Sequence, residues 1–178
     1  MRISTRQAEA MPALGSPREE TYECDLGTGR LLLAGDLPLE HDLPDPARRA
    51  LPAAGPPSRW VGLLEQYFAG RPVAFGLDVD EYADALGFTT FERDVYRALA
   101  AVPYGTALSY RDLATAAGHP NAYRAVGSAM ARNELPVLLP CHRVIKNDGR
   151  LGQYGDDPAW KERLLALEGV RLTRGERR

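Results

Sequence analysis

The chain has 178 residues, of which 44% are apolar, and its formal net charge is -2. This length and composition are sufficient to bury a core in one medium domain or two small ones. The slightly negative charge argues against general binding of polyanions. No apolar run is long enough to span a bilayer and no secretory signal follows the first basic residues, so we expect a cytoplasmic protein without a membrane partner.

The distribution of charge and the cysteine content restrict the expected partners and metal sites further. The segment Ser109–Arg150 has six basic and three acidic residues, so its net charge is +3 and that of the remainder is -5. A locally basic segment is compatible with a nucleic-acid surface, although solvated faces of this charge occur in many enzymes. Cys24 and Cys141 are expected to be free thiols, and no cysteine and histidine spacing resembles a zinc site.

The first part of the chain has the pattern of short strands. Residues 1–20 show no clear period, which predicts a loosely ordered lead-in. Thr21–Asp25 and Arg30–Leu33 are typical of two strands joined by a glycine-containing turn. Frequent proline favours a loop from Pro38 to Pro57.

A helix and a further strand are expected before a domain boundary. Ser58 is the expected N-cap of a helix that Gly70 ends. Strict alternation of apolar residues from Val73 to Val79 predicts a half-buried strand. A boundary near Gly87 then separates an N-terminal domain, residues 21–87, from a C-terminal domain, residues 88–178.

The C-terminal domain has a helical pattern. Thr89 and Glu92 have the spacing of a capping box, and the helix that they open ends before Pro103. Ser109 and Asp112 repeat the signature and open a short helix through Ala117. A third helix is expected from Ala122 to Arg132, after a turn at Gly118, His119 and Pro120. Two short helices joined by a tight turn are a candidate helix-turn-helix.

The third helix carries small residues, which permit close approach of a partner backbone. Arg124 near its start is placed to reach a phosphate or to insert between bases. Close packing of helices against one another explains small residues equally well. Asn133 after the helix fits a C-cap, and its position between this helix and Cys141 also allows it to link the two.

The run Leu139–Ile145 places Cys141 directly beside His142 and Arg143. A buried cysteine in apolar surroundings is inert, whereas an adjacent imidazole and guanidinium lower the pKa of a thiol and favour the thiolate. Cys141 is therefore a candidate nucleophile. Because adjacent side chains diverge, we expect a bridging water or a third group to connect Cys141 with His142.

Two patterns follow the cysteine. Asn147, Asp148 and Gly149 form a turn signal that indicates a hairpin or wing. Asp157 and Pro158 begin a final helix, which is expected to turn Trp160, Leu164 and Leu167 inward. Glu168 lies at its C-terminus, where the helix dipole disfavours a carboxylate, so a cationic partner such as protonated His142 would explain it. A solvated glutamate is the plainer alternative.

These motifs, namely Pro140-Cys141-His142-Arg143, Arg124-Ala125-Val126-Gly127, Asn133 and Glu168-Gly169, resemble those of the O6-alkylguanine-DNA alkyltransferases over Phe88–Val170. The resemblance implies an α+β protein with a small α/β N-terminal domain, which is ribonuclease H-like in the family. It also implies a helical C-terminal domain with a winged-helix-like helix-turn-helix. In such proteins a flipped-out O6-alkylguanine transfers its alkyl group irreversibly to a cysteine.

Carried over to this sequence, the resemblance implies a stoichiometric DNA repair enzyme in which Cys141 accepts the alkyl group. His142 acts as a base through water, Glu168 orients His142, Asn133 holds the turn, and Tyr110 donates a proton toward the departing guanine. Arg124 resembles the family's arginine finger. The remaining DNA-contacting positions are Tyr110, Arg111, Ala122, Tyr123 and Gly127. The apolar pocket wall is formed by Met130, Pro136, Val144, Tyr154 and Gly155.

The expected partner is double-stranded DNA that contains O6-alkylguanine, with O4-alkylthymine as a further substrate, and the expected protein is a monomer without a cofactor or metal. One departure from the family lies after Tyr154, where Gly155-Asp156-Asp157 replaces the usual serine, basic or aromatic residues. The Gly155 amide still offers a donor to O6. The alternatives are an alkyltransferase-like lesion-binding module or regulator without transfer, and a cysteine hydrolase that turns over many substrate molecules.

Overall fold

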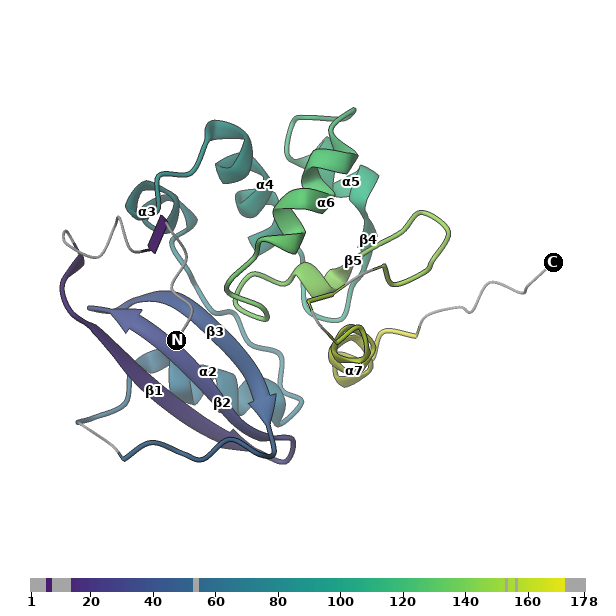
Figure 1. Cartoon of the computed structure of the whole chain (residues 1–178). Helices are drawn as coiled ribbons and strands as arrows, with labels where there is room; N and C mark the ends of the chain where they lie inside the picture. Colours follow the sequence, from purple (N-terminus) through teal and green to yellow (C-terminus); the bar gives the residue numbers. More distant parts are fainter. Residues whose placement is uncertain (1–5, 8–13, 53–54, 153, 156, 172–178) are drawn as a thin grey trace. The chain divides into compact units, whose positions relative to one another are not determined.

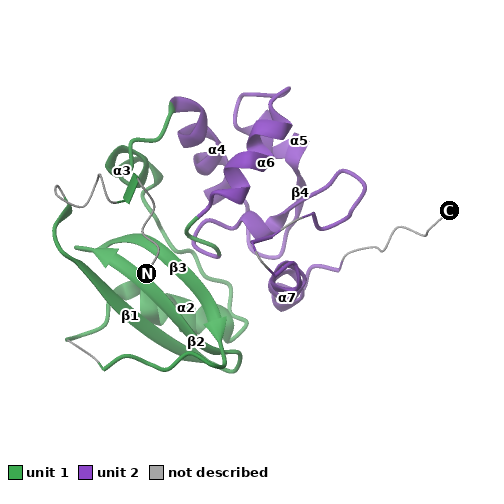
Figure 2. Cartoon of the chain, viewed as in Figure 1, with its two compact units in different colours: residues 1–89, 134–136 green, residues 90–133, 137–178 purple. Residues whose placement is uncertain are grey.

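The structure is a computed structural model that describes residues 6–7, 14–52, 55–152, 154–155 and 157–171. The chain divides into two compact units (Figure 2). The first contains residues 1–89 together with 134–136, and the second contains residues 90–133 and 137–178. The short segment 134–136 therefore belongs to the first unit although residues of the second unit flank it on both sides.

The first unit is built on a three-stranded antiparallel sheet in the order β1-β2-β3. The strands are β1 (Pro17–Cys24), β2 (Gly27–Ala34) and β3 (Leu37–Asp45), and α2 (Arg59–Phe68) lies across one face of the sheet (Figure 1). The two strands predicted around the turn at residues 26–29 are thus confirmed. Tyr22 is paired with Gly29 across the sheet, and a Cβ on Gly29 would lie 2.1 Å from the Tyr22 ring. Only glycine leaves room for that ring.

Three sequence predictions for this unit are wrong. The loosely ordered lead-in expected over residues 1–20 fails at its end, because residues 17–20 belong to β1. The loop expected from Pro38 to Pro57 is in part β3, which is an edge strand where a residue without an N–H is tolerated. The strand expected from Val73 to Val79 does not form, and residues 71–78 lack regular structure. Alternation of apolar residues does not by itself produce a strand, because a strand requires a neighbouring strand as its hydrogen-bond partner. Its last residue, Val79, instead opens α3 (Val79–Ala85), with Asp78 accepting hydrogen bonds as the N-cap.

The second unit contains the predicted helices of the C-terminal region. These are α4 (Thr90–Ala100), α5 (Tyr110–Ala116), α6 (Tyr123–Ala131) and α7 (Ala159–Leu167). A reciprocal capping box between Ser109 and Asp112 begins α5, as the sequence predicts. The Tyr96 hydroxyl donates to the Ala129 carbonyl at 3.1 Å, which fastens α6 to α4. Helices α5 and α6 both form where the sequence predicts two short helices.

The segment around the cysteine differs from the expectation. Cys141–Arg143 forms a single turn of 3-10 helix, η1, and β5 (Val144–Ile145) follows it. β5 pairs in parallel with β4 (Leu108–Ser109), so Val144–Ile145 is not a strand of the expected hairpin, and the wing after the cysteine stays a prediction. The turn itself is present, because the Lys146 amide donates to the Arg150 carbonyl at 2.8 Å. A strand partner was available in β4, which precedes α5 in sequence and could not be recognised from the local pattern.

The final helix α7 packs inward through residues that differ from those predicted by its apolar pattern. Leu164 is buried as predicted, but Trp160 and Leu167 are only half-buried, and Lys161 and Leu165 take the inward positions. The inward-facing positions of α7 are therefore shifted by about one residue from the predicted apolar stripe. Among the described residues, no helix is both long and apolar enough to cross a bilayer.

His41 in β3 organises a buried polar network within the first unit. Its Nδ1 lies 2.6 Å from the Pro136 carbonyl oxygen and its Nε2 lies 2.7 Å from the Tyr22 hydroxyl. Because a carbonyl can only accept, Nδ1 carries the proton, and Nε2 accepts from Tyr22. The His41 amide also donates to the Glu134 carbonyl at 2.8 Å. Burial lowers the pKa of His41 to about 4, against the hydrogen bond to Pro136, which raises it.

This network predicts a defined pH dependence of stability. Between pH 6.5 and about 4 the unfolded chain binds a proton on His41 and the folded chain does not. The stabilisation is therefore complete above pH 6.5 and is lost as pH falls toward 4, by up to about 3 kcal/mol. Urea unfolding at pH 7.5 and 4.5 measures the loss, which we expect to be smaller in His41→Gln. Equal losses in the two proteins would contradict this assignment.

Candidate active site

Cys141 begins η1 in the second unit, and its side chain is only 6% exposed. The Arg143 amide donates to the Pro140 carbonyl at 2.9 Å and closes the turn. Side chains in a 3-10 helix leave the axis roughly 120° apart, since there are about three residues per turn. Cys141, His142 and Arg143 therefore diverge, although they are adjacent in sequence.

Asn133 connects the end of α6 with the cysteine. Its side-chain Nδ2 donates to Cys141 Sγ and to the Leu139 carbonyl, each at 2.9 Å. One amide group thus fixes both the backbone that leads into η1 and the sulfur itself. The C-cap of α6 is Arg132, so Asn133 lies one residue beyond the helix and its side chain is available for these contacts.

Burial raises the pKa of the Cys141 thiol, and four interactions oppose that effect. They are the hydrogen bond from Asn133, the positive charge of Lys161, and the hydrogen bonds from the Tyr154 hydroxyl and the Cys141 backbone. The expectation that His142 and Arg143 are the main groups that lower this pKa is corrected, because the turn directs both of them to Glu168 instead. Proximity in sequence does not place their charges beside the sulfur.

Glu168, the C-cap of α7, is the centre of a buried ionic cluster. Its Oε1 lies 2.7 Å from His142 Nε2, and Arg143 donates to the carboxylate from Nε at 2.9 Å and from Nη2 at 2.9 Å. The Gly105 amide adds a fourth donor at 3.0 Å. Burial alone would raise the pKa of Glu168, but the hydrogen bonds from His142 and Arg143 lower it to about 2. The carboxylate is thus fully ionised, and the alternative of a solvated glutamate is excluded.

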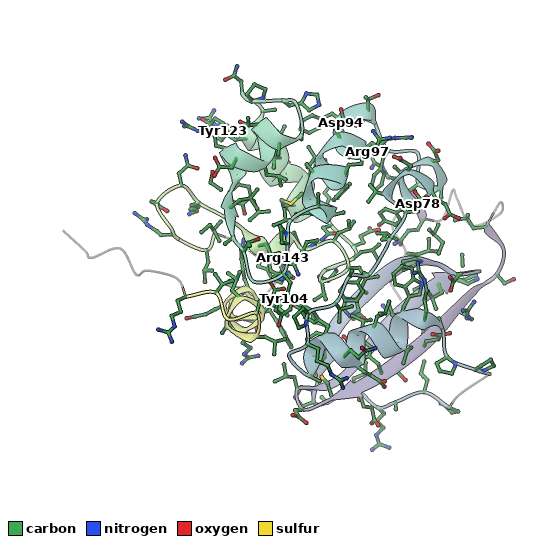
Figure 3. The ribbon with its side chains drawn as sticks, turned by 180° about the vertical axis from the view of Figure 1, so that it is seen from behind. Asp78, Asp94, Arg97, Tyr104, Tyr123 and Arg143 are labelled. Atoms are coloured by element: carbon green, nitrogen blue, oxygen red, sulfur yellow. The ribbon has the colours of Figure 1, made fainter. Side chains whose placement is uncertain are left out.

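Two further groups position Arg143 in this cluster. Its Nη1 donates to the Val102 carbonyl at 2.6 Å, and its guanidinium carbon lies 5.8 Å from the centre of the Tyr104 ring. Figure 3 shows Arg143 and Tyr104 close to helix α7, and the Tyr104 hydroxyl donates to the Leu167 carbonyl. Gly105 has a φ of 74°, and a Cβ there would lie 3.2 Å from the Glu168 carbonyl oxygen. A side chain at position 105 would therefore disturb the end of α7.

The cluster fixes the tautomer of His142. A carboxylate can only accept, so Nε2 carries the proton that is shared with Glu168. Burial lowers the pKa of His142, and although Glu168 raises it, the cations Arg143 and Lys161 add to the lowering. His142 is therefore neutral in the ground state, with its lone pair on the buried Nδ1. This is the arrangement of a base that can accept a proton.

Tyr110, the first residue of α5, lies between close neighbours. A Cβ on Gly127 of α6 would be 4.0 Å from the Tyr110 ring, and a Cβ on Gly152 would be 3.3 Å from its hydroxyl. The Lys161 ammonium lies 5.6 Å from the centre of the same ring. Burial raises the pKa of Tyr110, and Cys141 raises it further. Tyr110 is thus a protonated phenol in the electrostatic range of the sulfur.

The expected DNA-contacting residues occupy α5 and the start of α6. Arg111 and Arg124 are exposed, and their guanidinium carbons lie 5.8 Å and 6.0 Å from the Tyr123 ring centre. Tyr123 is 40% exposed and is labelled in Figure 3. Ala122 is the N-cap of α6 without a side-chain cap, and Gly127 is half-buried against Tyr110.

The residues expected to form the pocket wall do not share one environment. Met130, Val144 and Tyr154 are buried in the second unit, whereas Gly155 is exposed. Pro136 belongs to the first unit, where its carbonyl accepts from His41. Asp156 of the departure from the family pattern is outside the described residues, and Asp157 is exposed and receives a hydrogen bond from the Ala159 amide.

Sequence reasoning missed two residues of the site. Lys161 is 1% exposed and its charge lowers the pKa of Cys141, and its spacing three residues before Leu164 would have placed it on the inward stripe. Val137 has a φ of 74°, which is strained for a β-branched residue, in the segment that leads to the cysteine. No local sequence pattern predicts this positive φ at Val137. Within the described ranges, no group of three histidine, cysteine, aspartate or glutamate side chains is arranged to hold a metal.

Comparisons with known proteins identify the family. Residues 90–170 match the model of the "6-O-methylguanine DNA methyltransferase, DNA binding domain". A methylated-DNA–protein-cysteine methyltransferase from Mycobacterium leprae is 38% identical over 151 residues, which cover 81% of this chain and 88% of that protein. The chain belongs to the methylated-DNA–protein-cysteine methyltransferase family.

Further relatives show how far the family likeness extends. A methylated-DNA–protein-cysteine methyltransferase from Methanosarcina barkeri is 43% identical over 105 residues, which cover 59% of this chain and 63% of that relative. The chain therefore spans somewhat less than two thirds of that relative's length. Mycobacterium tuberculosis OGT in complex with DNA has a similar fold, with a TM-score of 0.60, 30% identity and coverage of 85% of this chain and 92% of that one. The expected mixed α and β architecture of this methyltransferase family is confirmed.

The buried cluster predicts a large effect of a small change in this family member. Glu168→Gln removes the only carboxylate that contacts the buried Arg143 guanidinium in the described part of the chain. We expect the free energy of unfolding to fall by about 3–5 kcal/mol, because an unpaired buried cation remains. Asp148→Asn is the matched control, since its ion pair with Arg150 is exposed, and we expect a loss below about 1 kcal/mol. Similar losses in the two variants in urea unfolding would refute a central role for Glu168.

Proposed function

We propose that this protein removes the alkyl group from O6-alkylguanine in duplex DNA and keeps it permanently on Cys141. The observation that carries the proposal is the placement of one buried sulfur beside Asn133 and next to a neutral His142 that Glu168 orients. Membership in the methyltransferase family and the match of residues 90–170 to its DNA-binding domain support it. The acceptor cysteine of the proposed reaction is present and free.

The proposed reaction begins with ionisation of the sulfur. The Cys141 proton passes through a water molecule to His142 Nδ1, and the imidazolium that forms is stabilised by the Glu168 carboxylate 2.7 Å from Nε2. Arg143 keeps that carboxylate in place and ionised through its own hydrogen bonds. Asn133 holds the sulfur through the approach of the substrate.

Displacement then transfers the alkyl carbon. A lone pair of Cys141 Sγ forms the sulfur–carbon bond while the bond from that carbon to O6 breaks and its electrons remain on guanine. The guanine takes a proton from the Tyr110 hydroxyl and leaves as the neutral base. The proton that His142 accepted from Cys141 then returns through water to the tyrosinate, so that both residues regain their starting forms. The products are repaired DNA and a chemically stable thioether on Cys141, so each molecule acts once.

Access to O6 requires the nucleotide to leave the duplex, because the atom is otherwise enclosed in the base stack. We assign DNA contact to the α5 and α6 helices, with Arg124 filling the gap that the nucleotide leaves. Tyr123 and Arg111 extend this surface, because an aromatic ring flanked by guanidinium groups suits both stacking on bases and contact with phosphates. Ala122 and Gly127 offer little side-chain bulk to a nearby DNA strand.

The proposal also covers the base pocket, a second substrate, the folds of the two units, the cellular location and the oligomeric state. Met130, Val144, Tyr154 and the Gly155 amide of the second unit are assigned to the pocket that receives the base, and O4-alkylthymine is a second substrate of the same chemistry. The N-terminal unit is assigned a ribonuclease H-like fold, and the C-terminal domain is assigned a winged-helix-like helix-turn-helix. The protein is assigned as a cytoplasmic monomer that requires no cofactor.

Transfer of a labelled methyl group tests the function directly. With duplex DNA that carries labelled O6-methylguanine, we expect label on the wild-type protein and on Cys24→Ser, and none on Cys141→Ala, which still binds the DNA. Denaturing electrophoresis measures the label. DNA binding by the wild-type protein without label would instead identify a lesion-binding module, and continued release of label over many turnovers would identify a hydrolase.

The DNA surface predicts a change in salt dependence. Arg124→Ala should weaken binding of undamaged duplex and reduce the slope of log K against log salt by about 1, because the DNA surface loses one cation that displaces a counterion. Arg163→Ala is the matched control, since Arg163 is also exposed and lies over an aromatic ring, that of Trp160 on α7. Fluorescence anisotropy between low and moderate salt gives both slopes. Equal slopes for Arg124→Ala and the wild type would remove Arg124 from the interface.

A further inference from the structure

Lys161 is a buried cation in the second unit without a carboxylate partner among the described residues. Its side chain is 1% exposed, and its Nζ donates to the Val144 carbonyl at 2.5 Å. An ammonium group removed from water is costly unless an anion or several dipoles replace the solvent. A single carbonyl is a weak replacement. A nearby negative charge would therefore stabilise the Lys161 ammonium.

The groups that face Lys161 come from three elements. Tyr110 of α5 and Tyr154 present their rings, with centres 5.6 Å and 5.9 Å from Nζ, and such rings stabilise a cation through their quadrupoles. η1 contributes Cys141 and His142, both of which interact electrostatically with Lys161. Burial lowers the pKa of Lys161 to about 8, and Cys141 raises it. Lys161 is thus mostly protonated at neutral pH.

Among the groups of the site that the structure describes, Cys141 is the one left to supply an anion for this cation. Arg143 and Glu168 form a neutral pair, and the pKa of His142 is lowered, so its resting form is neutral. With Cys141 as a thiol the buried cluster carries one excess positive charge. Its net charge becomes zero once the thiol proton has left for solvent, and it stays at +1 while His142 holds that proton. The interaction with Lys161 also lowers the pKa of Cys141, so the effect is reciprocal.

We propose that the Lys161 ammonium is the charge partner of the Cys141 thiolate and sets the fraction of sulfur that is ionised. Lys161 acts through the sulfur and is a positioning residue. His142 removes the proton, and Lys161 stabilises the anion that remains. The relevance of this pair to DNA repair rests on the proposed alkyl transfer, but ionisation of the sulfur can be measured without DNA.

Alkylation with iodoacetamide measures that ionisation, because the thiolate displaces iodide and forms a sulfur–carbon bond. The full chain is used with Cys24→Ser throughout, so that Cys141 is the only thiol. Lys161→Met removes the charge and keeps the apolar stem, and Lys161→Arg retains the charge. The matched control is Lys146→Met, which changes the chain's other lysine at an exposed position. Intact mass gives the rate of modification between pH 5 and 10.

We expect the rate at pH 7 to fall about tenfold in Lys161→Met, with the pH midpoint raised by about one unit and the plateau at high pH unchanged. Lys146→Met should follow the wild-type curve, and Lys161→Arg should recover most of the loss. A wild-type midpoint in folded Lys161→Met would overturn the proposal. If DNA transfer fails while this shift is present, only the proposed function fails; if transfer succeeds without the shift, only the role of Lys161 fails.

A second measurement applies even where Lys161→Met does not fold. Because the chain has two lysines, lysine labelled with nitrogen-15 gives two Nζ resonances, and the Lys146→Met spectrum assigns them. We expect the Lys161 pKa to be about one unit lower in Cys141→Ala than in the wild type, since its anionic partner is absent. An unchanged or higher Lys161 pKa in Cys141→Ala would overturn the proposal.

Discussion

The buried carboxylate of Glu168 joins three parts of the second unit that are distant in sequence. It receives hydrogen bonds from His142 and Arg143 of η1 and from the Gly105 amide, which lies between α4 and β4. Its position at the C-terminus of α7 opposes the helix dipole, and the positive charge of Arg143 offsets that cost, whereas His142, expected as a cationic partner, is neutral. Because the same carboxylate fixes the proton on Nε2 of His142, the interaction that holds the turn together also determines which nitrogen can act as a base.

The residues around the nucleophile Cys141 therefore have separate roles. His142 and Arg143 are directed to Glu168, so the sulfur depends on Asn133 and Lys161 for stabilisation of its anionic form. Burial opposes ionisation and protects the thiol in the resting protein, whereas the buried ammonium favours it. Such a balance suits a protein that reacts once, because premature modification of the sulfur would consume it.

The sequence was informative where a pattern is local. The capping box of Ser109 and Asp112, the helices around it and the strand pair that contains Tyr22 could all be predicted, because neighbouring residues determine them. The strand expected at Val73–Val79 failed because pairing depends on a distant segment, and β5 found its partner in β4 for the same reason. The cysteine motif identified the site, but the direction in which η1 turns each side chain, the burial of Lys161 and the strained Val137 depend on tertiary packing.

The central claim is that one sulfur atom accepts one alkyl group. Incubation with a several-fold excess of duplex DNA containing O6-methylguanine, followed by intact-mass and peptide-mass analysis, tests it most directly. The account predicts that each protein molecule gains a single methyl group, that this group lies on the peptide containing Cys141, and that one equivalent of lesion is repaired. Repair of several equivalents, or repair without added mass on that peptide, would contradict it.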